Sequence, residues 1–486
     1  MLFNSMAFAI FLPIVFLLYW IFPHRFRWVL LLIASYYFYM SWDVKYIFLI
    51  LFTTCVSYLS ARILEHATES GRRKVILAAA IVVGLFLLFF YKYYDFFLGS
   101  FSALLQPFAI SIHPVTLGLA VPIGISFYTF QSLGYVIDVY RGDIQAEHHF
   151  GKYAVFVSFF PQIVSGPIGR AGELLPQIKT ERHFDYNEAT YGLKLMALGF
   201  FKKLVLADNL GPHVDGVFGQ LQNYTGFSLV LTAIFFSLQI YCDFSGYSDI
   251  AIGTARLFGI NLMTNFKSPY FSASIKEFWS RWHISLSSWF RDYVYIPLGG
   301  NRVSKVRHGF NLLVTFLVSG LWHGAQWTFV LWGGLHGLMQ VIENTLFPSV
   351  YSKKSREKEI RHHFFWWIRV IFVFLLCTAA WVLFRADNME QVVYLFQNLF
   401  QGIGQVGTYL SSGIVALGIT LREGILLGIA VFVLAVFDYL SLKMDVLQVL
   451  STKKTAIKWA VYTVFVLYIF LFSPVNGSKE FIYFKF

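Results

Sequence analysis

Residues 75–94 read VILAAAIVVGLFLLFFYKYY, an almost unbroken apolar run. A helix of about 20 such residues is long enough to cross the hydrocarbon core of a bilayer. Arg72, Arg73 and Lys74 stand directly before the run, and basic residues of this kind gather at cytoplasmic helix ends. The stretch therefore predicts a transmembrane helix that begins on the cytoplasmic side.

Similar apolar runs recur throughout the chain. They predict about a dozen helices, some of them short enough to be tilted or re-entrant, at residues 8–22, 28–42, 46–60, 75–94, 117–139, 153–165, 191–206, 227–242, 310–321, 327–342, 364–384, 424–440 and 457–472. No basic residue precedes the first run, whereas His24, Arg25 and Arg27 follow it. We therefore expect an uncleaved, multi-pass protein of the cell (plasma or inner) membrane with its N-terminus outside.

The composition agrees with this class. Hydrophobic residues make up 57% of the 486 residues and charged residues 13%, against about 25% charged in soluble domains. These values exclude a soluble, a disordered or a disulfide-stapled secreted protein. The net charge of +12 resides mostly in short segments between apolar runs, which favours membrane lipids over nucleic acid as the partner of the basic residues. We expect one domain over residues 1–486.

A polar stripe marks one of the predicted helices. If residues 315–330 form a single helix, Thr315, Ser319, His323 and Gln326 share one face. Such a stripe in a membrane helix must face a partner or a wet cavity. His323 is its only titratable residue and thus a candidate catalytic base, with a hydrogen-bonded structural histidine as the alternative.

A second candidate region is an amphipathic stretch. Residues 275–293, taken as one helix, gather their large apolar side chains on about one third of the surface and place His283 at the border. The helix is too polar to span, so it would re-enter the membrane or simply anchor to its surface. The basic, aromatic insert around it, at about 267–309, suits a cytoplasmic mouth for an anionic acyl-CoA, with Arg281 and Arg291 as candidates for binding its phosphates.

Two carboxylates lie near membrane depth. Asp243 and Asp249 follow a long apolar run, and intramembrane carboxylates usually serve function. The alternative is that Gly246 opens a loop and the acids cap the next helix. The sequence has no GxSxG, Walker A or HExxH motif and no metal-ligand spacing of histidines, so no metal site is predicted.

Four stretches share their order and spacing with known motifs. They are FPQIVSGPI at 160–168, DFSGYSD at 243–249, FWSRWHISLSSWFRD at 278–292 with YIPLGGNR at 295–302, and LWHG at 321–324, and the ending FIYFKF at 481–486 adds to the match. Together they resemble the membrane-bound O-acyltransferase (MBOAT) family, in the branch of the AlgI-like alginate O-acetylation proteins. The resemblance implies an all-α ring of about 11–13 transmembrane and re-entrant helices around a central tunnel. It also implies His323 as the catalytic residue and His283 as a second one.

The resemblance further implies a reaction. Acetyl would pass from cytoplasmic acetyl-CoA, as donor substrate and without a bound cofactor, across the membrane toward hydroxyls of an exported polysaccharide, beside a periplasmic or extracellular acetyltransferase partner. A neutral imidazole suits the removal of a hydroxyl proton, a role for His323, while His283 would orient the donor thioester or polarise its carbonyl. Asp243 and Ser245 would line the tunnel or hold a histidine tautomer. Further candidates for substrate binding are Trp282, Trp322, Gln326 and Ser319.

Three other functions stay open at this point. A D-alanyl transferase for teichoic acid, using a carrier-protein thioester, would share the fold. A transporter or flippase would be expected to show inverted repeats and paired broken helices, and the sequence shows neither. A structural scaffold would leave the polar stripe around His323 unexplained.

Overall fold

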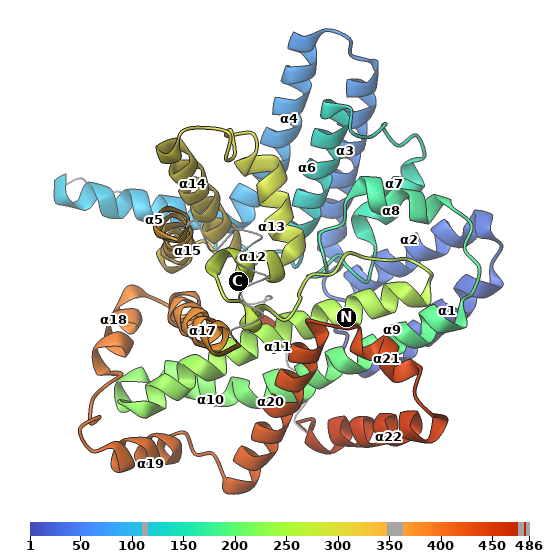
Figure 1. The fold of residues 1–486 in the computed structure, drawn as a ribbon. Coiled ribbons are helices and arrows are strands. Elements are labelled where there is room, and N and C mark those ends of the chain that lie inside the picture. The colour runs from blue at the N-terminus through green and yellow to red at the C-terminus, as the bar shows by residue number, and fades with distance from the viewer. Residues whose placement is uncertain (109–114, 348–362, 475–480, 483–486) are drawn as a thin grey trace.

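The computed structural model describes residues 1–108, 115–347, 363–474 and 481–482 (Figure 1). Within these ranges the regular elements are helices and none is a strand, which confirms the all-α prediction. The first part of the chain forms α1 (Met6–Ile21), α2 (His24–Met40), α3 (Ile47–His66), α4 (Ser70–Leu88), α5 (Tyr94–Leu105), α6 (Ile125–Arg141), α7 (Phe150–Ser158) and α8 (Ala171–Lys179).

The central part carries the sequence motifs. It forms α9 (Tyr186–Phe200), α10 (Asp208–Gly219), α11 (Phe227–Leu257), α12 (Ile275–Arg281), α13 (Ile284–Phe290), α14 (Lys305–His323) and α15 (Trp327–Leu346). The last part forms α17 (His363–Arg385), α18 (Met389–Asn398), α19 (Val406–Ala416), α20 (Leu421–Ser441), α21 (Val446–Ser451) and α22 (Thr455–Phe472). Short π-helical segments join α4 to α5 (η2, Phe89–Tyr93) and α9 to α10 (η4, Phe201–Ala207).

Six of the described helical segments are long and apolar enough to cross a membrane, which confirms a polytopic membrane protein. They are Val44–His66, Ser70–Phe108, Phe227–Leu257, Phe364–Arg385, Leu421–Ser441 and Thr455–Phe472. Other predicted spans fall on shorter helices: α7 has nine residues, and the helix of the 117–139 run begins only at Ile125. Outward-facing residues are apolar, as lipid contact requires, with Phe470 81% and Leu471 74% exposed on α22.

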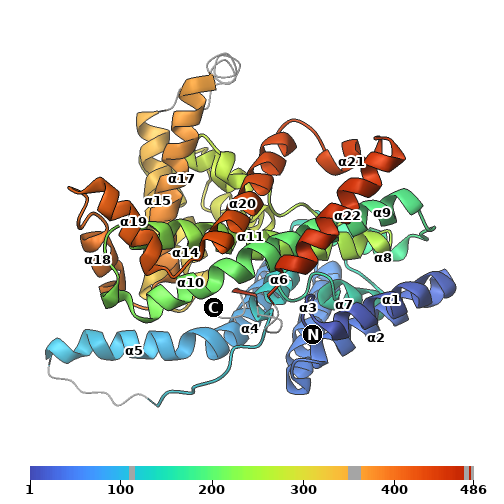
Figure 2. The same cartoon turned by 90° about the horizontal axis from the view of Figure 1, so that it is seen from below.

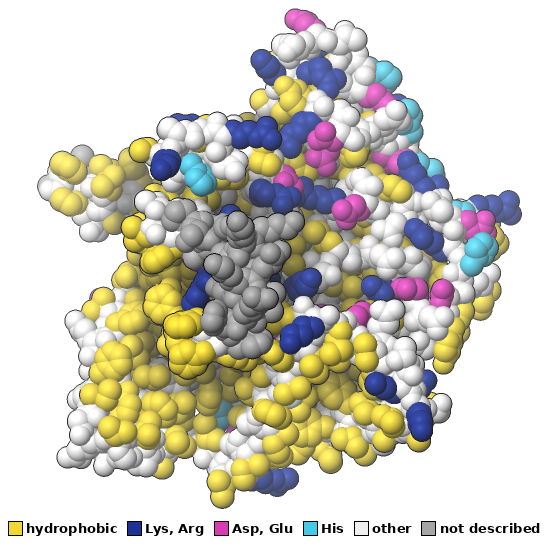
Figure 3. All heavy atoms as spheres, in the orientation of Figure 1, with side chains coloured by type: hydrophobic (Ala, Val, Ile, Leu, Met, Phe, Trp, Pro, Cys, Tyr) yellow, Lys and Arg dark blue, Asp and Glu magenta, His cyan; other side chains and the backbone are white. Residues whose placement is uncertain are grey.

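Charge is unevenly distributed over the molecule. Figure 3 shows lysine and arginine side chains gathered on the upper half of the face seen in Figure 1, in the region of α3, α4 and α14, and hydrophobic side chains over α18, α20 and α22. A basic face beside an apolar belt is what a helix bundle with one headgroup-facing side presents.

Glycines bring α9 and α11 into close contact. A Cβ atom on Gly192 would lie 2.6 Å from the carbonyl oxygen of Gly253, and one on Gly199 would lie 2.6 Å from that of Gly246. Small residues allow membrane helices to approach closely enough for backbone contact. The two pairs therefore hold the second half of α11 against α9.

Ion pairs between the two lysines of η4 and nearby carboxylates lie beside this contact. Lys203 Nζ on η4 lies 2.6 Å from Asp243 Oδ1 and 2.9 Å from Asp208 Oδ1, and Lys202 Nζ lies 2.8 Å from Asp249 Oδ2. The interpretation that Asp243 and Asp249 cap a new helix after a loop is wrong, because α11 continues unbroken through that stretch. The carboxylates instead neutralise two lysines at the centre of the bundle.

The described part of the C-terminal motif docks on the same cluster. The backbone N–H of Ile482 donates to Asp243 Oδ2 (2.5 Å). Lys203 Nζ lies 4.3 Å from the ring centroid of Phe481, which in turn packs 4.6 Å from the Tyr247 ring. The remaining residues of that motif, 483–486, lie outside the described ranges. Asp243 thus links η4, α11 and the end of the chain.

Candidate active site

The polar stripe on α14 leads to His323. Thr315, Ser319 and His323 lie on one buried face, 8%, 5% and 3% exposed, as predicted, and Asn311 extends the face by one more turn. The predicted place of Gln326 on this stripe is wrong. α14 ends at His323, Gly324 is extended, and Gln326 is an exposed N-cap residue of α15.

Close contact between α14 and α15 determines how α14 ends at His323. A Cβ atom on Gly320 would lie 2.3 Å from the carbonyl oxygen of Phe329, and one on Gly324 would lie 2.2 Å from the Phe329 ring. Only glycine fits at these two positions, so the chain can turn back directly after His323. The catalytic candidate therefore occupies the last position of a helix whose end is held by backbone packing.

Side chains from η2 cap the end of α14. Lys92 Nζ donates to the carbonyl oxygens of Trp322 (2.8 Å) and His323 (3.0 Å), and the hydroxyl of Tyr93 donates to that of Leu321 (3.0 Å). These are among the carbonyls that a helix end leaves without partners. Sequence reasoning missed Lys92, although a lysine inside the predicted span at 75–94 was a signal.

The chain breaks at His283. The prediction of one helix over residues 275–293 is wrong, because α12 ends at Arg281, α13 begins at Ile284, and His283 between them has a positive φ of 45°. The backbone N–H of Ile284 donates to the carbonyl oxygen of Asn265 (2.9 Å), so the loop at Asn265 takes up a donor that the continuous helix would have used itself. The predicted apolar face is nevertheless buried on both halves, at Phe278, Trp282, Leu286 and Trp289.

Asn265 determines the tautomer of His283. The backbone N–H of Ser285 donates to Asn265 Oδ1 (3.2 Å), and the Ser285 hydroxyl donates to the same atom (2.9 Å), which identifies that atom as the oxygen. His283 Nδ1 lies 3.1 Å from it and must therefore carry the proton. In neutral His283 the Nε2 atom is then an acceptor. Asn265, rather than Asp243 or Ser245, holds this tautomer.

The two histidines lie near each other within a cluster of aromatic side chains, which we call the aromatic chamber. Their ring centroids lie 6.3 Å apart, and both side chains are buried. Trp322 packs against both rings, 6.1 Å from His283 and 5.0 Å from His323. Phe244 of α11 lies 4.6 Å from His283, and Trp332 of α15 lies 5.1 Å from His323.

The chamber favours neutral imidazoles. Both histidines lie outside the six membrane-crossing helices, and burial lowers the pKa of His283 to about 3. Burial also lowers the pKa of His323 well below its ordinary value, and the positive charges of neighbouring groups, including Lys92, lower it further. A neutral imidazole is the form that can accept a proton.

A pocket opens on His323 from the side of η2. Its walls come from the extended chain before α6, the start of α6, and the loop after α7. It is lined by Lys92, Val121, Pro122, Ile123, Gly124, Ile125, Ser126, Phe127, Val164, Ser165, Trp322 and His323. The pocket joins two of the sequence motifs, because Val164 and Ser165 belong to the stretch at 160–168 and His323 to LWHG. A substrate in this pocket would lie against His323.

The other predicted residues lie in different surroundings. Ser245 is fully buried on α11, and Trp282 packs 4.8 Å from Trp381 in the aromatic core. Arg281 donates to Glu277 Oε1 (2.6 Å), and Arg291 donates to Asp292 Oδ1 (2.7 Å), a bond that raises the pKa of the Arg291 guanidinium. A phosphate bound by either arginine would therefore compete with a carboxylate. That Arg281 and Arg291 bind the phosphates of the acyl-CoA donor stays a prediction.

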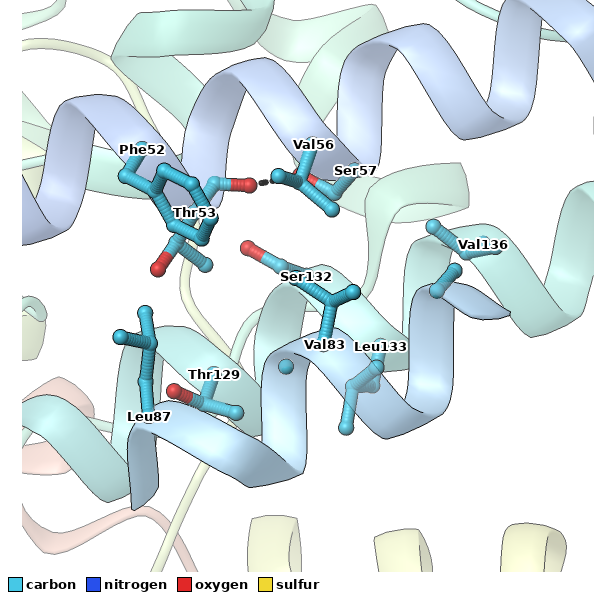
Figure 4. A pocket seen from close by; sticks show the side chains of 12 residues that line it. Phe52, Thr53, Val56, Ser57, Val83, Leu87, Thr129, Ser132, Leu133 and Val136 are labelled. Atoms are coloured by element: carbon cyan, nitrogen blue, oxygen red, sulfur yellow. Dashed lines mark hydrogen bonds between the residues drawn. The ribbon is translucent and has the colours of Figure 1, made fainter. Parts of the chain in front are cut away.

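A separate small cavity lies between α3, α4 and α6 (Figure 4). It contains none of the predicted site residues. The hydroxyl residues Thr53, Ser57, Thr129 and Ser132 border it, and the remaining labelled wall is apolar, from Phe52, Val56, Val83, Leu87, Leu133 and Val136. Its position between packed helices makes it a feature of the bundle interior and not of the histidine site.

Known proteins are similar in sequence to this chain over most of its length. A model of the membrane-bound O-acyltransferase family matches residues 145–386, a range that includes both histidines. A probable alginate O-acetylase AlgI from Azotobacter vinelandii is 40% identical over 82% of this chain and 78% of its own length. A peptidoglycan O-acetyltransferase from Helicobacter pylori is 35% identical over 82% of this chain and 80% of its own. A teichoic acid D-alanyltransferase from Streptococcus thermophilus is 32% identical over 51% of this chain and 64% of its own.

Proposed function

The chain belongs to the membrane-bound O-acyltransferase family, and we propose that it moves acetyl from cytoplasmic acetyl-CoA across the membrane toward hydroxyls of an exported cell-envelope polysaccharide. Two relatives that match more than three quarters of their own length carry names of O-acetylation of such polymers. The D-alanyltransferase relative matches only half of this chain. The proposal places the protein in the inner membrane beside a periplasmic acetyltransferase partner that could complete the transfer.

The observation that carries the proposal is the buried pair of His283 and His323, of which His323 lines a pocket. In the proposed step, His323 takes the proton from an acceptor hydroxyl while the oxygen attacks the thioester carbonyl. The new C–O bond forms, the C–S bond breaks, and the proton passes from the imidazolium to the departing thiolate. A positioned base of this kind contributes on the order of 10²- to 10⁴-fold.

The tautomer of His283 narrows its role. Polarising the thioester carbonyl would require a donor at Nε2, but Asn265 holds the proton on Nδ1. Neutral His283 can therefore orient a group by accepting a hydrogen bond from it, for example from the acceptor hydroxyl or from the imidazolium of His323. This supports an orienting role over a polarising one.

The test is CoA release from acetyl-CoA by the protein in nanodiscs, with and without polysaccharide and partner. We expect His323→Ala to lower release by about 10²-fold or more. His213→Ala is a matched control, because His213 is a mostly buried histidine bonded to Leu417 and Glu423 away from the site. Equal release by His323→Ala and wild type would contradict the assignment of the base. Activity only with a carrier-protein thioester would replace acetylation with D-alanylation.

A further inference from the structure

The C-terminal helices leave an apolar groove on the outside of the bundle. α20 and α22 form its walls, and Figure 2 shows α21 joining the upper ends of these two helices. Every lining side chain is uncharged, and its volume of about 430 Å³ falls within the range of small-molecule sites. The lining includes Phe201 of η4, Ile429 and Val433 of α20, and Val461, Val464 and Phe465 of α22.

The wall that α22 provides is not covered by protein. None of the α22 residues, all of which the structure describes, is buried. The helix meets η4 through aromatic side chains: the ring centroids of Phe465 and Tyr468 lie 5.1 Å and 6.2 Å from that of Phe201. In a bilayer the neighbours of such an exposed apolar face are acyl chains. The groove is therefore a place where a lipid chain takes up space that protein packing leaves open.

Two lysines meet at the end of the groove next to α21. Lys458 precedes the groove residue Ala460 by half a turn of α22, and its Nζ donates to the carbonyl oxygen of Ser451 (3.4 Å). Lys194 of α9 donates from its Nζ to the hydroxyl of the same Ser451. Within the described part of the chain, neither ammonium forms an ion pair with a carboxylate. Two positive charges thus converge on one residue at the corner between α21 and α22.

The acid at this corner does not neutralise the two lysines. Asp445 accepts from the Tyr191 hydroxyl (2.9 Å) and from the backbone N–H of Gln448 (3.0 Å). Lys194 lies outside the six membrane-crossing segments, and burial together with the charge of Lys458 lowers its pKa below the ordinary value. An anion between the two ammonium groups would stabilise both charges.

The lysine end of the groove lies at headgroup depth. Trp459, next to Lys458, is 66% exposed, and exposed tryptophans of membrane helices gather at the interface. Lys453 and Lys454 are exposed beside it, and such basic residues mark the cytoplasmic side. Figure 3 shows lysine and arginine side chains where α21 meets α22, at the border of the hydrophobic surface. The groove therefore leads from the cytoplasmic interface into the acyl region.

We propose that this groove binds an anionic glycerophospholipid of the cytoplasmic leaflet, with an acyl chain between α20 and α22 and its phosphate between Lys194 and Lys458. Basic pockets between membrane helices on this side recognise anionic headgroups. A zwitterionic lipid offers the same chains, but its own cation would face the two ammonium groups. The inference goes beyond the proposed acetyl transfer and does not depend on it.

The test titrates the full-length protein in detergent with phosphatidylglycerol, or with phosphatidylcholine of the same chains, and measures bound lipid by native mass spectrometry. We expect wild type to bind phosphatidylglycerol on the order of tenfold more tightly than phosphatidylcholine. Lys194→Gln combined with Lys458→Gln should abolish this preference, and arginine at both positions should retain it. Excess glycerol phosphate, which has the anion without the chains, should not displace the lipid.

Two controls match these changes. Lys453→Gln combined with Lys454→Gln removes the same charge from exposed lysines of the same corner and should leave the preference unchanged. Val464→Trp fills the groove and should weaken the binding of both lipids. Val466→Trp adds the same ring to α22 outside the groove lining, at a side chain that is 49% exposed, and should bind like wild type.

Equal binding of the two lipids by wild type overturns the proposal even if no variant folds. A preference that survives without Lys194 and Lys458 also overturns it. A preference lost as well in the Lys453 and Lys454 variant shows general attraction to a basic surface and not a site. Displacement by glycerol phosphate would show an anion site that needs no lipid, and wild-type binding by Val464→Trp would exclude the groove as the place of the chain.

Discussion

The imidazole rings of His283 and His323 lie 6.3 Å apart, although one belongs to the break between α12 and α13 and the other to the end of α14. Neither ring is placed by its own helix alone. Asn265 orients the first, and the glycine contacts between α14 and α15 set the position of the second. The pair is therefore sensitive to residues that touch no substrate.

If the histidines act together, their losses should not add. We expect His283→Ala to lower CoA release by about 10²-fold and the double variant with His323→Ala to be no slower than His323→Ala alone. The measurement is the initial rate of CoA release for the four proteins of the cycle. Strictly multiplicative losses would show that the two rings act independently.

Removing Asn265 should impair the site without removing either ring. Asn265→Leu takes away the acceptor for His283 Nδ1, and we expect a fall in kcat of about 10- to 100-fold, as for other residues that orient a functional imidazole. Asn265→Asp keeps the acceptor oxygen and should retain more activity. Ser248→Ala is the control, because Ser248 accepts from Asn265 Nδ2 (3.1 Å), on the other side of the amide. Activity of Asn265→Leu equal to that of wild type would exclude the orienting role.

The lowered pKa values of the two imidazoles predict that kcat/KM depends little on pH on the acidic side of neutrality. The base must be neutral, and burial lowers the pKa of His283 to about 3 and that of His323 well below its ordinary value. Acidification from pH 8 to pH 5.5 should therefore leave His283 neutral and protonate His323 less than an ordinary histidine, so kcat/KM should fall little. An ordinary histidine, with a pKa of about 6.5, would be about 90% protonated at pH 5.5. A pH–rate profile that falls with a midpoint near 6.5 would contradict the buried site.

The fold class and both histidines of the candidate site could be predicted from the sequence, His323 from the residues on its helix face and His283 as a catalytic residue only through the family resemblance. The run at 75–94 and its neighbours are apolar enough that only a membrane helix accommodates them. His323 was found because Thr315 and Ser319 precede it at intervals of four, the repeat of a helix face. That repeat belongs to α14 as it folds, and the prediction failed only at Gln326, where the chain has already turned.

The missing parts depend on contacts between distant segments. Apolar positions continue at helical spacing on both sides of His283, so periodicity gives no sign of the break that the loop at Asn265 imposes. The ion pair between Asp243 and Lys203 could not be predicted either, because Lys203 lies in η4, a segment far from Asp243 in the sequence. Lys92 lies in an apolar run where nothing local separates a lysine that reaches a headgroup from one that caps a helix.

Backbone contact between α14 and α15 should be necessary for the site. A Cβ atom on Gly333 would lie 2.2 Å from the carbonyl oxygen of Phe316, whereas one on Gly334 would meet only the Leu317 side chain at 3.2 Å. We expect Gly333→Ala to lower both the melting temperature and CoA release, and Gly334→Ala to be tolerated, since a side chain can move and a backbone cannot. Thermal unfolding in detergent distinguishes the two variants. Equal stability of both would show that the helices separate at little cost.

The C-terminal residues should stabilise the buried ion pairs. Phe481 is 1% exposed and covers Lys203, while the next backbone N–H donates to Asp243. Truncation of a buried phenylalanine costs about 3–5 kcal/mol, so Phe481→Ala should clearly lower the melting temperature of the detergent-solubilised protein. Phe470→Ala is the matched control, because Phe470 is 81% exposed on α22, and it should unfold like wild type. If Phe481→Ala unfolds at the wild-type temperature, the docked chain end is not a structural part of the bundle, and the Lys203–Asp243 pair is stable without its cover.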